Sequence, residues 1–226
     1  MNVVTFASRK GGAGKSTLTA HVAAFAHHLG RRTLLVDADP QGSLSLWHAI
    51  RADARLPLQT AARGIARPLA FAQVDGYEWV FIDTAPSMWV VVQEAIRAAT
   101  LVVIPIRPGF FDLAAVRETV AVAREHGKPY AVVINAAPVK RDERETPAVT
   151  QSRVELEGLG IPVWSGQISQ RAGFVISLAE GGSAGELYLD SAAGQEIARL
   201  WSAIERSVQA INHVREEKGP QRGEAA

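Results

Sequence analysis

The chain has 226 residues, of which 47% are hydrophobic, and its 24 basic and 23 acidic residues leave a formal charge of +1. This balance is typical of an ordinary globular protein, and it excludes a general electrostatic attraction to nucleic acid or membrane. The sequence contains no cysteine, which excludes disulfides, thiolate metal sites and iron–sulfur clusters bound by its own residues.

Apolar runs that resemble strands alternate with helical runs along the whole chain. The expected strands cover residues 3–7, 33–37, 56–60, 79–82, 101–105, 130–135 and 160–164. The expected helices cover 18–29, 44–50, part of 61–76, 88–99, 113–125, 147–159, 172–180 and 191–217, with a loop at 184–190. This order predicts an α/β fold with a doubly wound, mainly parallel β-sheet and helices on both faces. We expect one domain over residues 1–217 and a disordered polar tail over 218–226.

A glycine-rich segment joins the first strand to the first helix, and residues 8–17 read SRKGGAGKST. Such a turn binds phosphate, because its backbone N–H groups and the positive end of the helix dipole point at the same place. Lys15 is expected to pair with the β- and γ-phosphates, and the Ser16 hydroxyl to bind Mg²⁺. The strict P-loop pattern has glycine where this chain has Arg9, so the loop is a variant that also carries a second lysine, Lys10.

The stretch KGGAGKST resembles the deviant P-loop of the ParA/MinD ATPases, and the resemblance spans nearly the whole chain. Within that family, the chain most resembles the small ParA-type partition ATPases. In that family the early lysine reaches the nucleotide of the partner subunit in an ATP-sandwich homodimer. The resemblance therefore implies ATP and Mg²⁺ as cofactors, and catalytic roles for Lys15 and, in trans, for Lys10. The nucleotide-binding residues it implies in the loop are Gly11, Gly12, Ala13, Gly14, Lys15, Ser16 and Thr17.

Two aspartates follow the second strand, at the strand end where ligands bind in open parallel sheets. Residues 37–42 read DADPQG and resemble a stretch of the same family. That resemblance implies that Asp39 orients the attacking water and that Asp37 is an outer-shell partner of the metal. The alternative is a simple turn, because Asp-Pro and Gln-Gly both favour turns.

A third aspartate, Asp83, ends the apolar run of residues 79–82. A Walker B carboxylate occupies such a strand end and holds Mg²⁺ opposite the P-loop serine, so Asp83 is the candidate. Residues 84–87 resemble the switch segment that senses the γ-phosphate. The alternative for Asp83 is a helix cap.

Weaker signals lie further along the chain. The family resemblance implies that Asn135, at the end of a strand, contacts the adenine ring, although a turn asparagine is the alternative. Phe110 and Phe111 belong to a segment that in the family lies near the dimer interface, or else they form a buried turn. Asp112 is expected to cap the helix that follows.

The resemblance also implies partners. Relatives bind DNA without sequence preference through their C-terminal part, where this chain offers Arg171, Arg199 and Arg206, each of which could instead be an ordinary surface residue. The implied protein is a slow ATP hydrolase, stimulated by a ParB-like protein or cargo adaptor. It would be cytoplasmic, associated with the nucleoid when bound to ATP, and would partition plasmid, chromosome or protein cargo.

Other functions on the same scaffold remain open. One is a MinD-like positioning ATPase at the membrane, but the three basic and three acidic residues between 215 and 226 cancel, so membrane binding is not expected. Another is an accessory ATPase of secretion or cellulose synthesis. A third is a metabolic enzyme such as a biotin-pathway ligase, or a tyrosine kinase, although the chain has only three tyrosines.

Overall fold

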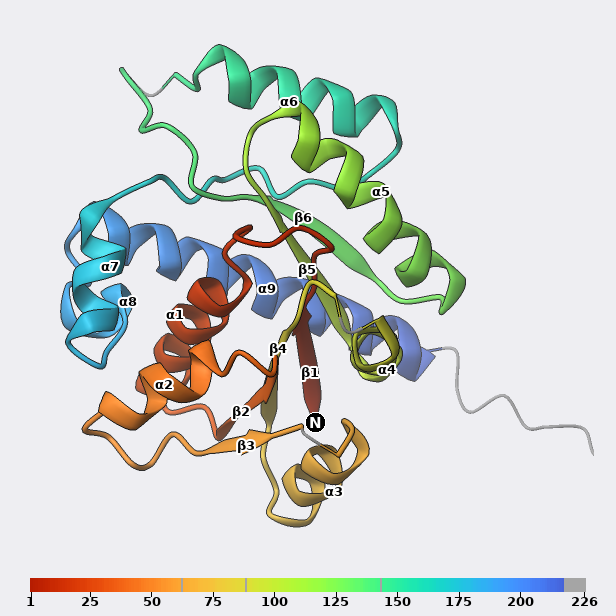
Figure 1. Ribbon diagram of the computed structural model, residues 1–226, viewed down its shortest axis with the longest axis vertical. Helices are drawn as coiled ribbons and strands as arrows, with labels where there is room; N and C mark the ends of the chain where they lie inside the picture. The colour runs from red at the N-terminus through yellow and green to blue at the C-terminus, as the bar shows by residue number, and fades with distance from the viewer. Residues whose placement is uncertain (62, 88, 143, 218–226) are drawn as a thin grey trace, which may run out of the picture.

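Six parallel strands form the central sheet, in the order β3-β2-β4-β1-β5-β6 (Figure 1). The computed structural model describes residues 1–217 except 62, 88 and 143. The strands are β1 (Asn2–Phe6), β2 (Thr33–Ala38), β3 (Leu58–Thr60), β4 (Trp79–Thr84), β5 (Leu101–Ile106) and β6 (Tyr130–Ile134). The predicted doubly wound parallel sheet is therefore confirmed.

Strands β2, β4 and β5 are buried along their whole length. This is expected of parallel strands that are covered by helices on both faces. The register places Asp37 of β2 opposite Asp83 of β4, and Phe6 of β1 opposite the same Asp83. The carboxyl ends of the three neighbouring strands therefore bring two acidic side chains next to the start of the glycine-rich loop.

The helices divide between the two faces of the sheet. They are α1 (Lys15–His28), α2 (Ser43–Ile50), α3 (Ala66–Val74), α4 (Trp89–Ala98), α5 (Phe110–Glu125), α6 (Pro147–Gly158), α7 (Ala172–Ala179), α8 (Ala184–Leu187) and α9 (Ala192–Glu217). Because side chains alternate along a strand, Val4 and Phe6 join the core formed with α1, α2 and α7–α9, whereas Val3 joins the core under α3 and α4. A further core lies between β5, β6 and helices α4–α6.

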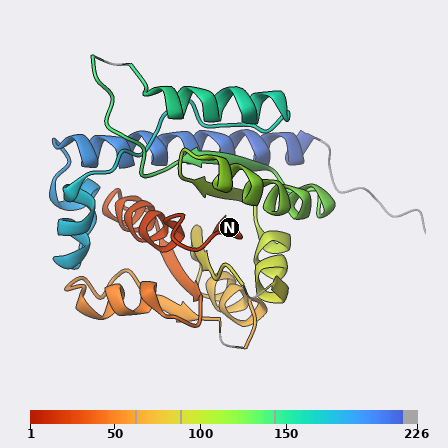
Figure 2. The same ribbon diagram turned by 45° about the horizontal axis from the view of Figure 1, so that its top comes forward.

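Helix α9 is a long helix that extends along almost the whole width of the molecule (Figure 2). Its apolar stripe packs on the sheet as predicted, with Ile197, Leu200 and Ile204 buried. Trp201 is central to this contact. The centroids of its ring and of the Trp79 ring on β4 lie 4.7 Å apart. Aromatic pairs in this edge-on arrangement add to the stabilisation from burial.

Several predicted boundaries were wrong. The expected loop at 184–190 contains α8, because Ser183 and Glu186 form a reciprocal capping box that nucleates one helical turn. The expected strand at 160–164 is reduced to a single bridge between Val163 and Val132. Helix α5 begins at Phe110, so Asp112 lies inside its first turn instead of capping it.

The tail, residues 218–226, lies outside the described residues. No helix among those described is long and apolar enough to cross a bilayer.

His21 is a buried polar side chain that connects α1 to α8. Its Nδ1 accepts a hydrogen bond from the backbone N–H of Ala184 at 3.2 Å, and its ring packs edge-on against Phe174. Burial lowers the pKa of His21 to about 4, although a backbone hydrogen bond at Phe174 acts in the opposite direction. His21 is therefore neutral in the folded protein at neutral pH.

This burial predicts a loss of stability in mild acid. The unfolded chain binds a proton at His21 near pH 6.5 and the folded chain does not, so the free energy of unfolding falls between pH 6.5 and 4, by about 3 kcal/mol in all. The variant His21→Asn keeps an acceptor for Ala184 and should lose this component in urea unfolding measured across that range. The exposed His28 provides the control, His28→Asn. An unchanged pH dependence in His21→Asn would contradict the assignment.

Candidate nucleotide-binding site

The glycine-rich loop, residues 8–14, leaves β1 and leads directly into α1 (Figure 1). Gly14 occupies the N-cap position in a left-handed conformation, with φ 94°, and no side chain caps the helix there. The first N–H groups of α1 are therefore available to an anion, and the helix dipole adds partial positive charge at the same point. Gly12 is also left-handed, with φ 71°, which glycine adopts without strain.

Asn135 fixes the loop from the end of β6, two strands away from β1 in the sheet. The residue directly follows β6 and is buried, and its Nδ2 donates a hydrogen bond of 2.8 Å to the carbonyl of Ala13. A Cβ on Gly14 would lie only 2.1 Å from this Nδ2, so glycine is required there. Asn135 therefore positions the loop. Its other amide N–H and its Oδ1 are not used in that bond, and the adenine contact stays a prediction.

The two loop lysines have different surroundings. Lys15 is buried, and its Nζ donates to the carbonyl of Lys10 at 3.3 Å. Burial lowers the pKa of Lys15, while the nearby charges of Asp83 and Asp39 raise it in part. Lys10 is more exposed, and its Nζ forms an ion pair with Asp112 in the first turn of α5.

Asp37 and Asp39 both shape the turn that follows β2. Asp37 accepts hydrogen bonds from the backbone N–H of Asp39 at 3.1 Å and from the Ser45 N–H and hydroxyl at 2.9 and 2.6 Å. Its carboxylate therefore holds the N-terminus of α2. Asp39 is half-buried and accepts from the N–H of Gln41 at 2.9 Å. These aspartates therefore do shape a turn, as the alternative predicted, and Asp39 also lies close enough to Lys15 for its charge to act on it.

Asp83 lies within β4 and not at a helix start, which contradicts the helix-cap alternative. Its side chain is fully buried, and neither carboxylate oxygen has a hydrogen-bond partner of good geometry among the described residues. Burial raises the pKa of Asp83 to about 7. The Ser16 hydroxyl and the Lys15 charge oppose this rise, whereas the charges of Asp37 and Asp39 add to it.

These residues fit a magnesium ion. A buried carboxylate without partners is costly, and the Ser16 hydroxyl that lowers its pKa is the second oxygen donor. Mg²⁺ binds through one or two protein oxygens together with water and substrate phosphates. Ser16 and Asp83 can supply those protein oxygens. The carboxylate of Asp37 accepts hydrogen bonds from the start of α2, so Asp37 can act only as an outer-shell partner of the metal.

A pocket of about 290 Å³ opens on the β5–β6 side of the loop. Its walls include Gly12, Gly14, Thr17 and Asn135, and Phe174 of α7 forms an apolar part. Residues 168–171 form another wall. This pocket has the position and the mixed polar and apolar character of a nucleoside site.

The three candidate DNA-binding arginines differ in their surroundings. Arg171 lines the 290 Å³ pocket, and its Nε pairs with the buried carboxylate of Glu196 at 3.0 Å. Arg199 and Arg206 lie on the exposed face of α9. By its location, Arg171 therefore belongs to the candidate nucleotide-binding site.

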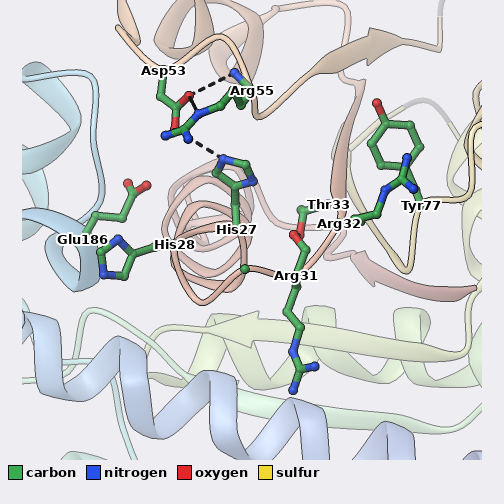
Figure 3. A pocket seen from close by; sticks show the side chains of 10 residues that line it. His27, His28, Arg31, Arg32, Thr33, Asp53, Arg55, Tyr77 and Glu186 are labelled. Atoms are coloured by element: carbon green, nitrogen blue, oxygen red, sulfur yellow. Dashed lines mark hydrogen bonds and ion pairs between the residues drawn. The ribbon is translucent and has the colours of Figure 1, made fainter.

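A larger cavity, of about 480 Å³, lies at the other end of α1. Figure 3 shows His27 and Arg55 directed at Asp53, while Arg31 points away toward α9. The hydrogen bonds of Arg55 hold the pKa of Asp53 below its usual range. The charged groups at the centre of this cavity thus neutralise one another, so its size does not indicate the functional site.

Sequence reasoning missed Arg107, Phe174 and Glu196. Arg107 directly follows β5, so its position at a strand end was a signal of the same kind that identified Asp39 and Asp83. Phe174 and Glu196 reach the site from helices far along the chain, and no local pattern marks them.

The packing around Gly14 predicts that alanine substitution destabilises the protein at Gly14 and not at Gly11. Gly14→Ala should lower the free energy of unfolding by about 2 kcal/mol, since it combines a left-handed backbone with a clash against Asn135, and should weaken ADP binding at least about tenfold. A Cβ on Gly11 would meet no atom within 4 Å, so Gly11→Ala is the control for urea unfolding. Equal unfolding midpoints for the two variants would contradict this packing.

Comparison with known proteins agrees with this geometry. Residues 4–184 match the model of the CobQ/CobB/MinD/ParA nucleotide binding domain. The chain is 35% identical over 192 residues to the maintenance of carboxysome distribution protein A of Gloeobacter kilaueensis, covering 75% of this chain and 88% of that protein.

Two further proteins are more distant. The chromosome-partitioning ATPase Soj of Thermus thermophilus is 28% identical over 152 residues, covering 54% of this chain and 61% of Soj. The MinD cell division protein of Aquifex aeolicus shares the fold with a TM-score of 0.70 at 19% identity, covering 91% of this chain and 97% of that one. On the match over residues 4–184, the chain belongs to the CobQ/CobB/MinD/ParA nucleotide-binding domain family.

Proposed function

We propose that the protein is a ParA-type ATPase that dimerises with ATP, binds DNA without sequence preference and positions a cargo, with ATP hydrolysis as the reset. The observation that carries the proposal is the buried carboxylate of Asp83 beside Lys15 and Ser16, whose oxygens have no hydrogen-bond partner of good geometry within residues 1–217 as described. That arrangement favours binding of a cation, and the glycine-rich loop next to it favours phosphate. Together they support a site for a nucleoside triphosphate with magnesium.

The proposed reaction is hydrolysis of the γ-phosphate by water. Asp39, at the mouth of the site, orients the water in line with the γ-phosphorus, and Lys15 neutralises charge on the phosphoryl oxygens. Ser16 and Asp83 would hold Mg²⁺, which when bound would offset the charge of the phosphates. The products are ADP and phosphate.

Lys10 would act on the nucleotide of the partner subunit. In the single chain its ammonium group pairs with Asp112 of its own α5. Its side chain is 36% exposed, so the lysine can exchange Asp112 for phosphate oxygens of a second subunit. Dimerisation would therefore compete with this ion pair.

The exposed face of α9 is the proposed DNA-binding surface. Arg199 and Arg206 are seven residues apart, which places them on one side of the helix about 10 Å from each other. The nearest acidic side chains of the helix are engaged elsewhere: Glu196 pairs with Arg171, and Glu205 with Arg31. Two arginines that form no ion pair with any described carboxylate suit contact with phosphates.

The cargo is proposed to be a protein assembly or a DNA region. This rests on the similarity to a protein named for carboxysome distribution and to one named for chromosome partitioning. A partner on the cargo would stimulate hydrolysis, and the ATP-bound dimer would reside on the nucleoid in the cytoplasm.

The nucleotide cycle is tested with Asp39→Ala. This variant should hydrolyse ATP at least about tenfold more slowly and should accumulate as a dimer with ATP and Mg²⁺ in sedimentation velocity, since the water is no longer oriented. Adding Lys10→Ala to the same background should abolish the dimer while leaving most nucleotide binding. Hydrolysis by Asp39→Ala at the wild-type rate would overturn the role of Asp39.

The DNA surface is tested in the Asp39→Ala background with non-specific duplex DNA at several salt concentrations. Arg199→Gln with Arg206→Gln should weaken binding and reduce the slope of log K against log salt by about 2, because two phosphate contacts are lost. Arg97→Gln with Arg117→Gln removes the same charge from exposed positions on α4 and α5 and is the control. ATP-dependent binding to anionic vesicles and not to DNA would replace the proposal with membrane positioning. Binding to neither would favour an accessory ATPase.

A further inference from the structure

Arg107 is a cation at the nucleotide site that belongs to none of the motifs above. It follows β5 directly, between Ile106 and Pro108. Its backbone N–H donates to Oδ1 of Asp112 at 3.2 Å, and the N–H of Asn135 donates to the carbonyl of Ile106 at 2.7 Å. The main chain before and at Arg107 is thus anchored to α5 and to the residue that fixes the glycine-rich loop.

The side chain of Arg107 lies over that loop. Its Nη2 is 3.7 Å from the point where a Cβ on Gly12 would stand. Arg107 also lines the 290 Å³ pocket together with Gly14 and Thr17. The guanidinium is therefore placed between the nucleoside pocket and the phosphate cradle.

The charge of Arg107 has no counter-ion within the described part of the chain, and its side chain is exposed. The neighbouring cations of the loop differ in this respect, because Arg9 pairs with Glu118 at 2.9 Å and Lys10 pairs with Asp112. A guanidinium carries five N–H donors in a planar fork that matches phosphate oxygens. Arg107 is consequently equipped to bind an anion that enters the pocket.

We propose that Arg107 binds the phosphates nearer to the nucleoside, which ADP and ATP share. Lys15, Asp39 and Asp83 occupy the β2–β4 side of the loop, where the terminal phosphate must lie to react, whereas Arg107 reaches the loop from the β5–β6 side. Arg107 is therefore a nucleotide-binding residue, and Asp112 is its positioning residue through the backbone. The inference rests on nucleotide binding at this loop, as proposed above.

The test measures equilibrium binding of ADP and ATP with Mg²⁺, together with ATP turnover. Arg107→Ala should raise the Kd of both nucleotides by about tenfold or more, since a charge-assisted hydrogen bond is lost. The value of kcat at saturating ATP should stay within about twofold, because the contact is equal in ground and transition states. Arg107→Lys should recover part of the affinity, and Arg9→Ala is the control for loss of a paired cation beside the loop.

The outcomes separate the two claims. Failure of the wild-type protein to bind ADP would overturn nucleotide binding itself. Wild-type binding with unchanged affinity in Arg107→Ala would overturn only the role of Arg107. An equal loss for adenosine and ADP would place the guanidinium on the nucleoside and contradict the phosphate contact. Urea unfolding without nucleotide should be unchanged in Arg107→Ala, and a destabilised protein would indicate a structural role instead.

Discussion

The site depends on one constraint, the burial of the Asp83 carboxylate without a hydrogen-bond partner of good geometry among the described residues. Asp83 lies on β4, the strand between β1 and β2, and the register sets it opposite Phe6 and Asp37. Burial raises its pKa to about 7, so the charged form is unfavourable until a cation neutralises it. Lys15 and Ser16, in the first turn of α1, are the groups that oppose this rise. The proposed binding of magnesium with a nucleotide would therefore relieve an unfavourable feature of the free protein.

The acidic turn after β2 is connected mechanically to a distant part of the fold. Asp37 holds the first turn of α2 through Ser45. At the far end of the same helix Arg51 forms a buried bidentate ion pair with Glu186, with one of its bonds at 2.9 Å, and Trp47 donates to the carbonyl of Gly182. Breaking a buried pair of this kind is strongly destabilising. Residues 37–42 consequently cannot move far unless α2 and α8 move with them.

The sequence could predict whatever a local pattern encodes. The glycine-rich loop, the aspartates at strand ends and the stripe of α9 were all predicted, because each is a short signal placed by strand or helix periodicity. The clamp of Asn135 on Ala13 joins residues 122 positions apart, so its geometry depends on the sheet order and not on its neighbours. The single turn of α8 was missed although its capping box is local. The pairing of Arg171 with Glu196 likewise becomes visible only after α9 has packed.

The most direct test of the account is thermal unfolding of the wild-type protein and Asp83→Asn, each with ADP in the presence and absence of Mg²⁺. Because ligands that bind only the folded state raise its stability, Mg²⁺ should increase the stabilisation by ADP in the wild-type protein. Asp83→Asn should lose that increase, and without ligands at pH 8 it should unfold at a higher temperature than wild type, since the buried charge is gone. An Mg²⁺ effect of the same size in both proteins would contradict the central role of Asp83.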